Sequence, residues 1–366
     1  MVDIAFEGCN MSREWLKYNY FMDRRGRLDS TVDSLGDCMS QVTYVIGSKE
    51  FNGSDFYKVY LNESTFILQT EYNNLHYLGT KENVWRRCMI AFYMMDDSNH
   101  QNCSASEKVS KLLQREKPAI IAPIVERLPF EELYDPNYKE NEPKSEHYFS
   151  IIAEDERNFY FIDNPAVINR SNFIPYEGNN EIGIISKKDF DDLSEGYCKI
   201  STPIFNEEII KKVIEGCEDV FRFSYENYNK KTSSKGNIST FYGIEALNKF
   251  SELLENGNMR FEQDAPSKDR DLITYFRWRI WHIKGRRNLQ IKYLKDVYDT
   301  SNEKSGNLIS ALGESLKYWG LLNDNLFKDF LKGKSNADSR YVPLINKIIS
   351  SENEMHSAYR GFIENV

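Results

Sequence analysis

The chain has 366 residues, carries a formal net charge of −9, and is 40% hydrophobic and 14% aromatic. This composition is typical of a folded globular protein, and the length allows two domains with a large buried core. The negative net charge disfavours nucleic acid as the main partner, because phosphate binding requires a basic surface. No run approaches the roughly 20 apolar residues of a membrane span, so we also expect no membrane partner.

The N-terminal residues lack the basic and then apolar pattern of a signal peptide, which predicts a cytoplasmic protein. The six cysteines are dispersed and form no Cys-x-x-Cys pair; they are Cys9, Cys38, Cys88, Cys103, Cys198 and Cys217. We therefore expect free thiols rather than a disulfide framework or a zinc site. The sequence also has no glycine-rich phosphate loop and no cluster of metal ligands, so neither a metal nor an organic cofactor is predicted.

The first predicted element is a helix over residues 10–25, because Met11, Trp15, Tyr18 and Met22 recur on one of its faces. Shorter elements follow along the next part of the chain. They are a mixed segment with a second helix candidate at 29–53, a strand at 66–69, helices at 83–95 and 104–116 (the second with a capping box at its start), a buried strand at 117–125, a loop at 128–144, a hairpin at 147–163 and a strand at 181–186.

The pattern changes near Thr202. No strand is predicted from Asn206 onward, and helical periods recur instead. They cover residues 207–223, 240–255, 269–298, 306–331 and 341–364. The sequence therefore predicts an α+β domain over residues 1–202, with an N-terminal helix and an antiparallel sheet, followed by an all-α domain over residues 203–366.

The segment from His147 to Asp163 is the most informative one. It predicts a strand that opens on the histidine, a charged turn, and a second strand that closes on the aspartate. Tight pairing of these strands would bring the two ends together, and a histidine oriented by a carboxylate is two thirds of a nucleophilic triad. Each residue also has a simpler interpretation: His147 as a surface residue at a strand end, and Asp163 as a turn residue before Asn-Pro.

Cys9 is the preferred candidate for the nucleophile. It precedes the predicted helix at 10–25, where unpaired N–H groups and the helix dipole favour a thiolate. Cys38 is the rival candidate, and it also follows a glycine closely. The residues after Cys38 include Val42 and Thr43, however, and such β-branched residues predict a poorer helix. An ordinary buried cysteine is the alternative interpretation of Cys9.

The spacing of Cys9, His147 and Asp163 resembles that of papain-like cysteine peptidases, with aspartate in place of asparagine. Several motifs resemble, more narrowly, the N-terminal domain family named after butirosin biosynthesis protein H. The motifs are Gly8-Cys9-Asn10, Lys117-Pro-Ala-Ile-Ile-Ala-Pro-Ile, Leu128-Pro-Phe, Glu146-His-Tyr-Phe-Ser-Ile-Ile-Ala and Tyr160-Phe-Ile-Asp-Asn-Pro. Members of that family often carry a helical C-terminal domain.

This resemblance implies a papain-like protease fold used as an acyltransferase of specialised-metabolite biosynthesis. Such an enzyme would move an acyl group from a carrier-protein thioester, by way of an acyl-enzyme on Cys9, to an amine such as a diamine. The implied partners are an acyl or peptidyl carrier protein, whose phosphopantetheine arm presents the substrate, and a small amine acceptor. The papain glutamine has no counterpart here, which leaves the Cys9 backbone N–H as the one oxyanion donor named.

Two other hypotheses stay open. The same residues would serve a cysteine peptidase or amidohydrolase, in which water is the acceptor. A protein that binds a natural product on an inactive scaffold belongs to a different class.

The C-terminal region adds two candidate binding features. The basic and aromatic segment Arg277–Arg287 could dock an acidic carrier protein, although a solvated helix face is the simpler interpretation. Glu352 and Glu354 could attract an amine, although solvated carboxylates are again the default. The sequence leaves a homodimer open.

Overall fold

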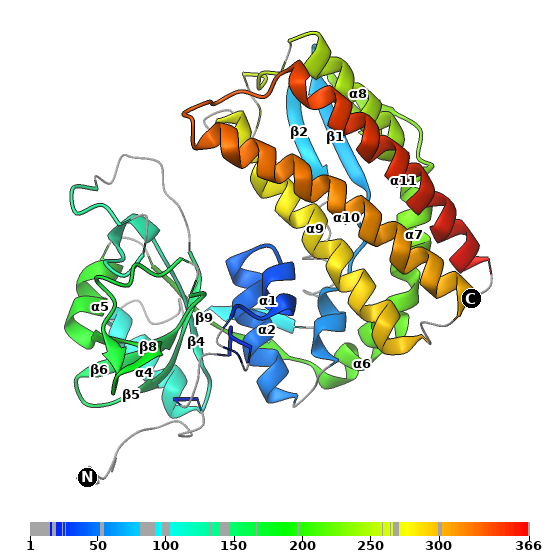
Figure 1. Ribbon diagram of the computed structural model, residues 1–366. Helices are drawn as coiled ribbons and strands as arrows, with labels where there is room; N and C mark the ends of the chain where they lie inside the picture. Colours follow the sequence, from blue (N-terminus) through cyan, green and yellow to red (C-terminus); the bar gives the residue numbers. More distant parts are fainter. Residues whose placement is uncertain are drawn as a thin grey trace. The chain divides into compact units, whose positions relative to one another are not determined.

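The computed structural model describes residues 15–16, 20–23, 25, 27–51, 55–80, 92–96, 103–131, 134–138, 147–165, 167–195, 198–257, 259–263, 265, 271–298 and 302–364. The chain divides into two compact units (Figure 1). The first comprises Met1–Phe56 and Met89–Ile210, and the second comprises Tyr57–Cys88 and Lys211–Val366. The chain therefore passes between the units more than once. The sequence predicts a single boundary near residue 202, which differs from this division.

The first unit is built on a sheet of seven strands in the order β3-β9-β4-β5-β6-β8-β7, and neighbouring strands are antiparallel. The strands are β3 (Phe92–Asp96), β4 (Ala119–Pro123), β5 (Phe149–Glu154), β6 (Asn158–Ile162), β7 (Pro175–Tyr176), β8 (Asn179–Ser186) and β9 (Cys198–Phe205). The central strands β4 and β5 are buried along their whole length, as expected from their continuous apolar runs.

The helices of this unit are α1 (Ser30–Ser34), α2 (Cys38–Glu50), α4 (Ala105–Gln114) and α5 (Lys187–Ser194). The predicted capping box at the start of α4 is present, between Ser104 and Glu107. Helices α4 and α5 lie against the same face of the sheet. Ser110 of α4 donates a hydrogen bond to Glu154 of β5, and the ring of Phe190 of α5 packs on Phe159 of β6.

The hairpin formed by β5 and β6 confirms the prediction for residues 147–163. Ser150 pairs with Ile162 and Ile151 pairs with Phe161, and an irregularity in the register follows before Ala153. Because β5 begins soon after His147 and β6 ends just before Asp163, this register brings those two residues to the same end of the hairpin.

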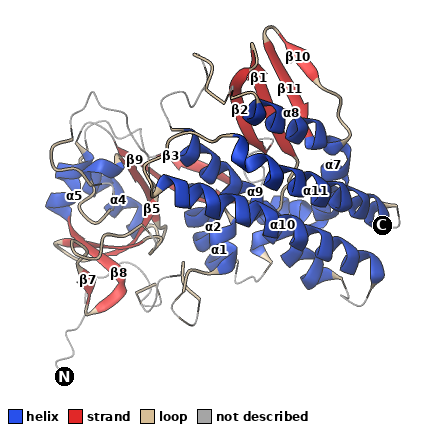
Figure 2. Ribbon diagram, turned by 45° about the horizontal axis from the view of Figure 1, so that its top comes forward, coloured by secondary structure: helices blue, strands red, loops and turns tan. Residues whose placement is uncertain are grey.

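The second unit combines a small sheet with long helices (Figure 2). Its four strands lie in the order β10-β11-β1-β2: β1 (Phe66–Glu71), β2 (Asn74–Thr80), β10 (Ser233–Lys235) and β11 (Ile238–Tyr242). The helices are α7 (Asp219–Tyr228), α8 (Gly243–Glu255), α9 (Leu272–Val297), α10 (Glu303–Phe330) and α11 (Val342–Ile363), and α6 (Glu207–Glu215) spans the boundary between the units. Helix α10 packs against both α9 and α11.

The prediction of an all-α region after Asn206 is wrong in one respect, because β10 and β11 are strands. Strand β10 is short, polar and fully exposed, and the Ile-Ser-Thr-Phe-Tyr sequence of β11 does not alternate between apolar and polar residues, so no strand pattern marks either. Strand β11 pairs with a distant segment, since Ile67 of β1 lies opposite Tyr242, and β10 pairs with β11 at the edge of the sheet. The pairing of β1 with β11 explains why residues 57–88 belong to the second unit.

Two predicted helices have other outcomes. The helix at 10–25 lies mostly outside the described residues, but Tyr20 and Phe21 lie in a turn and Met22 forms an isolated bridge with Leu28. The helix at 83–95 is wrong at its end, since Phe92–Asp96 forms β3, and its earlier part lies outside the described residues. Among the residues that the structure describes, no helix has both the length and the apolar character needed to cross a membrane.

Candidate active site

Cys38 is the first residue of α2, and the local sequence fixes the start of this helix. Asp37 caps it: one carboxylate oxygen accepts the backbone N–H of Ser40 at 2.7 Å and the other accepts the Ser40 hydroxyl at 2.7 Å. Gly36 turns the chain into the cap with a φ of 78°, a backbone conformation that favours glycine. The Cys38 sulfur therefore belongs to a first helical turn, where backbone N–H groups and the helix dipole favour negative charge.

His147 and Asp163 meet at the end of the β5–β6 hairpin, as the sequence predicts. The His147 Nε2 lies 2.9 Å from Asp163 Oδ1 and 2.8 Å from Oδ2. Both residues are buried, with 8% of His147 and 1% of Asp163 exposed. The imidazole is therefore oriented by a carboxylate and still has a small accessible area.

The Cys38 side chain forms a hydrogen bond with His147. The other described cysteines have different surroundings. Cys103 accepts a hydrogen bond from Lys111, and Cys217 is buried against backbone carbonyls. Burial raises the pKa of the Cys198 thiol to about 11. Cys9, the nucleophile that the sequence favours, lies outside the described residues. Of the described cysteines, it is the rival candidate Cys38 that contacts the histidine.

Burial and neighbouring charges move the pKa values of this group. Burial alone lowers the pKa of His147, but the hydrogen bond with Cys38 and the charge of Glu131 outweigh it, and the pKa is raised from its ordinary value. Burial raises the pKa of the Asp163 carboxyl to about 7, although hydrogen bonds from Glu131 and from the backbone of Asn164 act in the opposite direction. Perturbed pKa values that share a cause in one buried cluster mark this cluster as a candidate functional site.

Glu131 is a third member of this cluster that the sequence did not reveal. Its carboxylate lies 3.2 Å from His147 Nε2 and hydrogen-bonds to the Asp163 side chain, and only 2% of the residue is exposed. It lies in the segment 128–144, for which the sequence predicts a loop. A single acidic residue in a polar loop gives no sequence signal for burial beside a histidine.

Gln41 and Asn164 connect α2 to the end of β6. The Asn164 Nδ2 donates to Gln41 Oε1 at 3.0 Å, and the Asn164 backbone N–H donates to Asp163 at 2.6 Å. Gln41 also donates to the Val32 carbonyl at 3.1 Å. Gln41 lies about one helical turn after Cys38, so this chain of hydrogen bonds fixes the thiol-bearing turn relative to Asp163. Its sequence signal is weak, since each residue simply neighbours a candidate site residue.

The same cluster offers donor atoms of the kind that bind cations. Glu131, His147 and Asp163 each present one ligand atom, and these atoms lie within 4.8 Å of one another. Such an arrangement could hold a divalent cation. Direct contacts already join His147 Nε2 to the two carboxylates: a hydrogen bond to Asp163 at 2.8 Å and an ion-pair contact with Glu131 at 3.2 Å.

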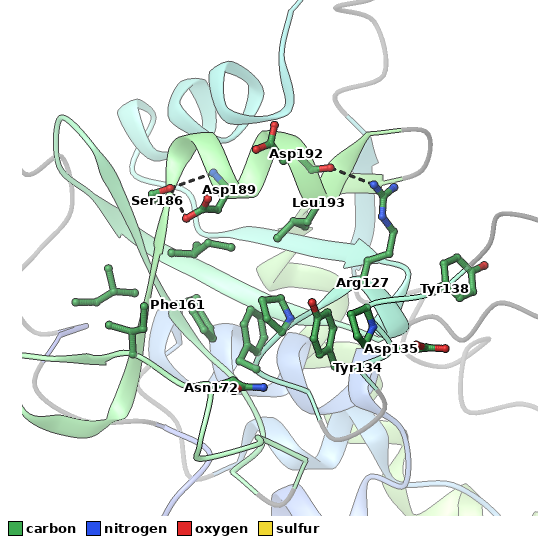
Figure 3. Close-up of a pocket in the computed structure, with 16 residues that line it drawn as sticks. Arg127, Tyr134, Asp135, Tyr138, Phe161, Asn172, Ser186, Asp189, Asp192 and Leu193 are labelled. Carbon is green, nitrogen blue, oxygen red and sulfur yellow. Dashed lines mark hydrogen bonds between the residues drawn. The ribbon is translucent and has the colours of Figure 1, made fainter.

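A pocket of about 480 Å³ opens in the same unit, near α5 (Figure 3). Its buried walls include Phe130 and Phe161. Phe130 directly precedes Glu131 in the chain, and Phe161 lies two residues before Asp163. Arg127 lies at one side and donates hydrogen bonds to the backbone carbonyls of Asp192 and Glu195. This volume suits a small organic ligand.

The charges around this pocket are mainly negative. Asp135, Asp189 and Asp192 line it together with Arg127 as the only basic residue among the described lining residues. No sequence pattern predicts this pocket, because its lining comes from separate parts of the chain: β6, β8, α5, the 3-10 helix at Val125–Arg127 and several loops.

One residue from each of the two C-terminal binding features, Arg287 and Glu352, is part of a buried ion pair. Arg287, in the basic segment now seen as part of α9, is fully buried and pairs with Glu352 of α11 at 2.5 Å. The hypothesis that Glu352 attracts an amine is therefore wrong, because its carboxylate is fully buried and already bound. Glu354 is exposed on α11, as its default interpretation expected. Arg277 and Arg279 lie over aromatic rings of the same unit.

In comparisons with known proteins, no protein-family model matched the chain and no curated protein matched it. The function is therefore inferred from the geometry of the site.

Proposed function

We propose that this protein is a cysteine-dependent acyl-transfer enzyme. Cys38 is the nucleophile, His147 is the general acid and base, and Asp163 orients the imidazole. The observation that carries this proposal is the continuous line of hydrogen bonds from the thiol at the start of α2, through the buried imidazole, to the carboxylate at the end of β6. Nucleophile, base and orienting group in this order are the requirements of nucleophilic catalysis.

The chemistry follows from these positions. The Cys38 thiolate attacks the acyl carbonyl, and the His147 imidazolium gives its proton to the departing group, which leaves a thioester on Cys38. An acceptor then attacks this thioester while His147 takes the acceptor's proton, and the thiolate is released. The backbone N–H groups of Cys38 and Met39, in the first turn of α2, are candidates to stabilise the oxyanion.

This proposal moves the nucleophile from Cys9 to Cys38. It keeps the reaction that the resemblance to the butirosin biosynthesis protein H family implies, namely transfer from a carrier-protein thioester to an amine. Three of the motifs that carry the resemblance include residues of β4, β5 and β6, whereas its cysteine motif, Gly8-Cys9-Asn10, lies outside the described residues and does not include Cys38. Hydrolysis by a peptidase or amidohydrolase uses the same residues and differs only in the acceptor.

The pocket near α5 supports an amine as the acceptor. Its three carboxylates outnumber its single guanidinium, and the guanidinium of Arg127 already donates to backbone carbonyls. Negative charge of this kind favours a cationic ligand such as an ammonium group. We therefore propose this pocket as the binding site for the amine.

Intact-protein mass spectrometry after incubation with a simple aryl thioester tests the proposal. We expect a single acyl adduct on the wild type and on Cys9→Ala, and none on Cys38→Ala. Here Cys9→Ala is the matched control, because it removes a thiol from the same unit. An adduct that survives in Cys38→Ala and disappears in Cys9→Ala would return the role of nucleophile to Cys9.

The acceptor is identified in a second step. The isolated acyl-enzyme is mixed with a diamine or with buffer alone, and the loss of the adduct is followed over time. Faster loss with the diamine, accompanied by the amide product, supports amide synthesis. Equal rates support a hydrolase, and the absence of any adduct on the wild type would favour the binding-protein hypothesis.

A further inference from the structure

Glu131 reaches the proposed site from a segment that takes no part in the triad. It follows a short 3-10 helix, Val125–Arg127, and its carboxylate lies 3.2 Å from His147 Nε2. It also hydrogen-bonds to the side chain of Asp163. One imidazole nitrogen therefore faces two carboxyl groups that contact each other, and both carboxyl residues are at least 98% buried.

Two carboxyl groups in hydrogen-bond contact need a proton between them, because an ionised carboxylate is only an acceptor. Two adjacent negative charges in a buried site are also unfavourable, so one of the pair keeps its proton. The ionisable groups that face the pair in the described structure are the His147 imidazole and, beyond it, the Cys38 thiol. Gln41 and Asn164, which contact the other side, are neutral.

We propose that Glu131 and Asp163 share one proton, so that Glu131 is a positioning residue that holds Asp163 against His147 and leaves a single negative charge beside the imidazole. This inference rests on the proposed function, since it assigns a second carboxyl to the same site. One negative charge balances one imidazolium, which is the state of His147 when Cys38 is a thiolate.

The proton balance is consistent with the burial of the pair. Burial raises the pKa of the Asp163 carboxyl, which is the direction that favours a retained proton beside Glu131. The coupled pair titrates as a unit, and the shared proton belongs to both carboxyls.

Two variants of Glu131 that are similar in size test whether the site needs a hydrogen-bond donor to Asp163 or a negative charge at residue 131. Glu131→Gln keeps a hydrogen-bond donor to Asp163 permanently and has no charge, as the shared-proton state requires. Glu131→Leu fills the same space without a donor. The measurement is the rate at which iodoacetamide alkylates Cys38, read at the Cys38 peptide by mass spectrometry between about pH 5 and 7, where histidine charge matters most.

We expect Glu131→Gln to react within about twofold of the wild type, and Glu131→Leu to react about tenfold more slowly, because Asp163 loses the partner that fixes it. A tenfold loss in Glu131→Gln, about one pKa unit of imidazolium stability, would mean that a second negative charge is needed and would overturn the shared proton. Equal rates for Glu131→Leu and the wild type would also overturn it. If Glu131→Leu does not fold, as judged by circular dichroism, Glu131→Gln alone decides.

This readout needs no substrate, so it separates the two proposals. If wild-type Cys38 is alkylated no faster than Cys103, the proposed function and this inference fail together. If wild-type Cys38 is reactive and only the pattern of the Glu131 variants differs from that expected, the shared proton fails and the acyl-transfer function stands.

Discussion

Each unit of the molecule buries a cluster of ionisable side chains, and the two clusters differ in how their charges are balanced. In the second unit the Arg287 guanidinium meets the Glu352 carboxylate, and neither side chain is exposed. Glu352 also accepts hydrogen bonds from Ser315 at 2.7 Å, from Trp319 at 2.8 Å and from Tyr228. Both oxygens of this carboxylate are therefore satisfied and the two charges cancel.

The cluster in the first unit is balanced differently. Glu131 and Asp163 bring two carboxyl groups to the His147 imidazole, and the Cys38 thiol forms a hydrogen bond with the same side chain. The pKa of Asp163 is raised to about 7 and that of His147 is also raised, so protons rather than fixed opposite charges balance this group. The comparison separates a cluster that joins helices α9 and α11 through fixed charges from one whose ionisable groups have raised pKa values, as the proposed reaction requires.

Removing the histidine gives the largest expected effect. His147→Ala should slow acylation of the enzyme by about 10²- to 10⁴-fold, because the general acid and base is lost. Some stability should be lost as well, because His147 is buried and its raised pKa stabilises the folded state, but Glu131 and Asp163 can keep a shared proton. Stopped-flow acylation and thermal unfolding measure the two effects, and His356→Ala, in the second unit, is the matched control. Acylation that survives in His147→Ala would exclude this site.

The opposite pattern is expected for the cluster of the second unit. Glu352→Leu leaves the Arg287 charge buried without its partner, which should destabilise the unit by about 3–5 kcal/mol. The rate of Cys38 alkylation in the folded protein should not change. Urea unfolding measures the stability, and the double variant Arg287→Met/Glu352→Leu should recover most of the loss. A double variant as unstable as the single one would mean that packing, and not the stranded charge, is responsible.

The pH dependence of stability should distinguish the two units. The folded pKa of Asp163 lies above its unfolded value, so the folded state binds more protons and stability falls as pH rises from about 4 toward 7. The raised pKa of His147 acts in the same direction, since its contribution is lost as pH rises through the folded pKa. Asp163→Asn should remove the part of this decrease in unfolding free energy that comes from Asp163. Thermal unfolding between pH 4 and 8 measures it, and an equal slope in both proteins would contradict the raised pKa of Asp163.

The parts of the site that the sequence predicts are those that depend on neighbours in the chain. The β5–β6 hairpin is local, so the meeting of His147 and Asp163 follows from strand patterns and a turn. The sequence favours Cys9 over Cys38, because Val42 and Thr43 lower the helix propensity of the residues after Cys38. Both are buried in the structure, and burial together with the cap at Asp37 outweighs that propensity.

Contacts between distant segments could not be predicted in the same way. Glu131 approaches His147 only after the sheet has formed, and no pattern in its own segment indicates this. The strands β1 and β11 come from parts of the chain that are far apart, and each is too short to identify its partner. The domain boundaries were missed for the same reason.

The smallest expected effect concerns the pocket near α5, which belongs to the first unit. Asp192→Asn should raise the KM for a diamine by about two- to fivefold, because an exposed carboxylate contributes about 0.5–1 kcal/mol to binding a cation. Acylation of Cys38 should be unchanged, because that step does not involve the amine. Asp33→Asn is the control, since Asp33 is exposed in the same unit and does not line the pocket. The effect should weaken as salt is added, because the interaction is screened by ions. An identical KM in both variants would place the amine elsewhere and leave the acyl-transfer chemistry unaffected.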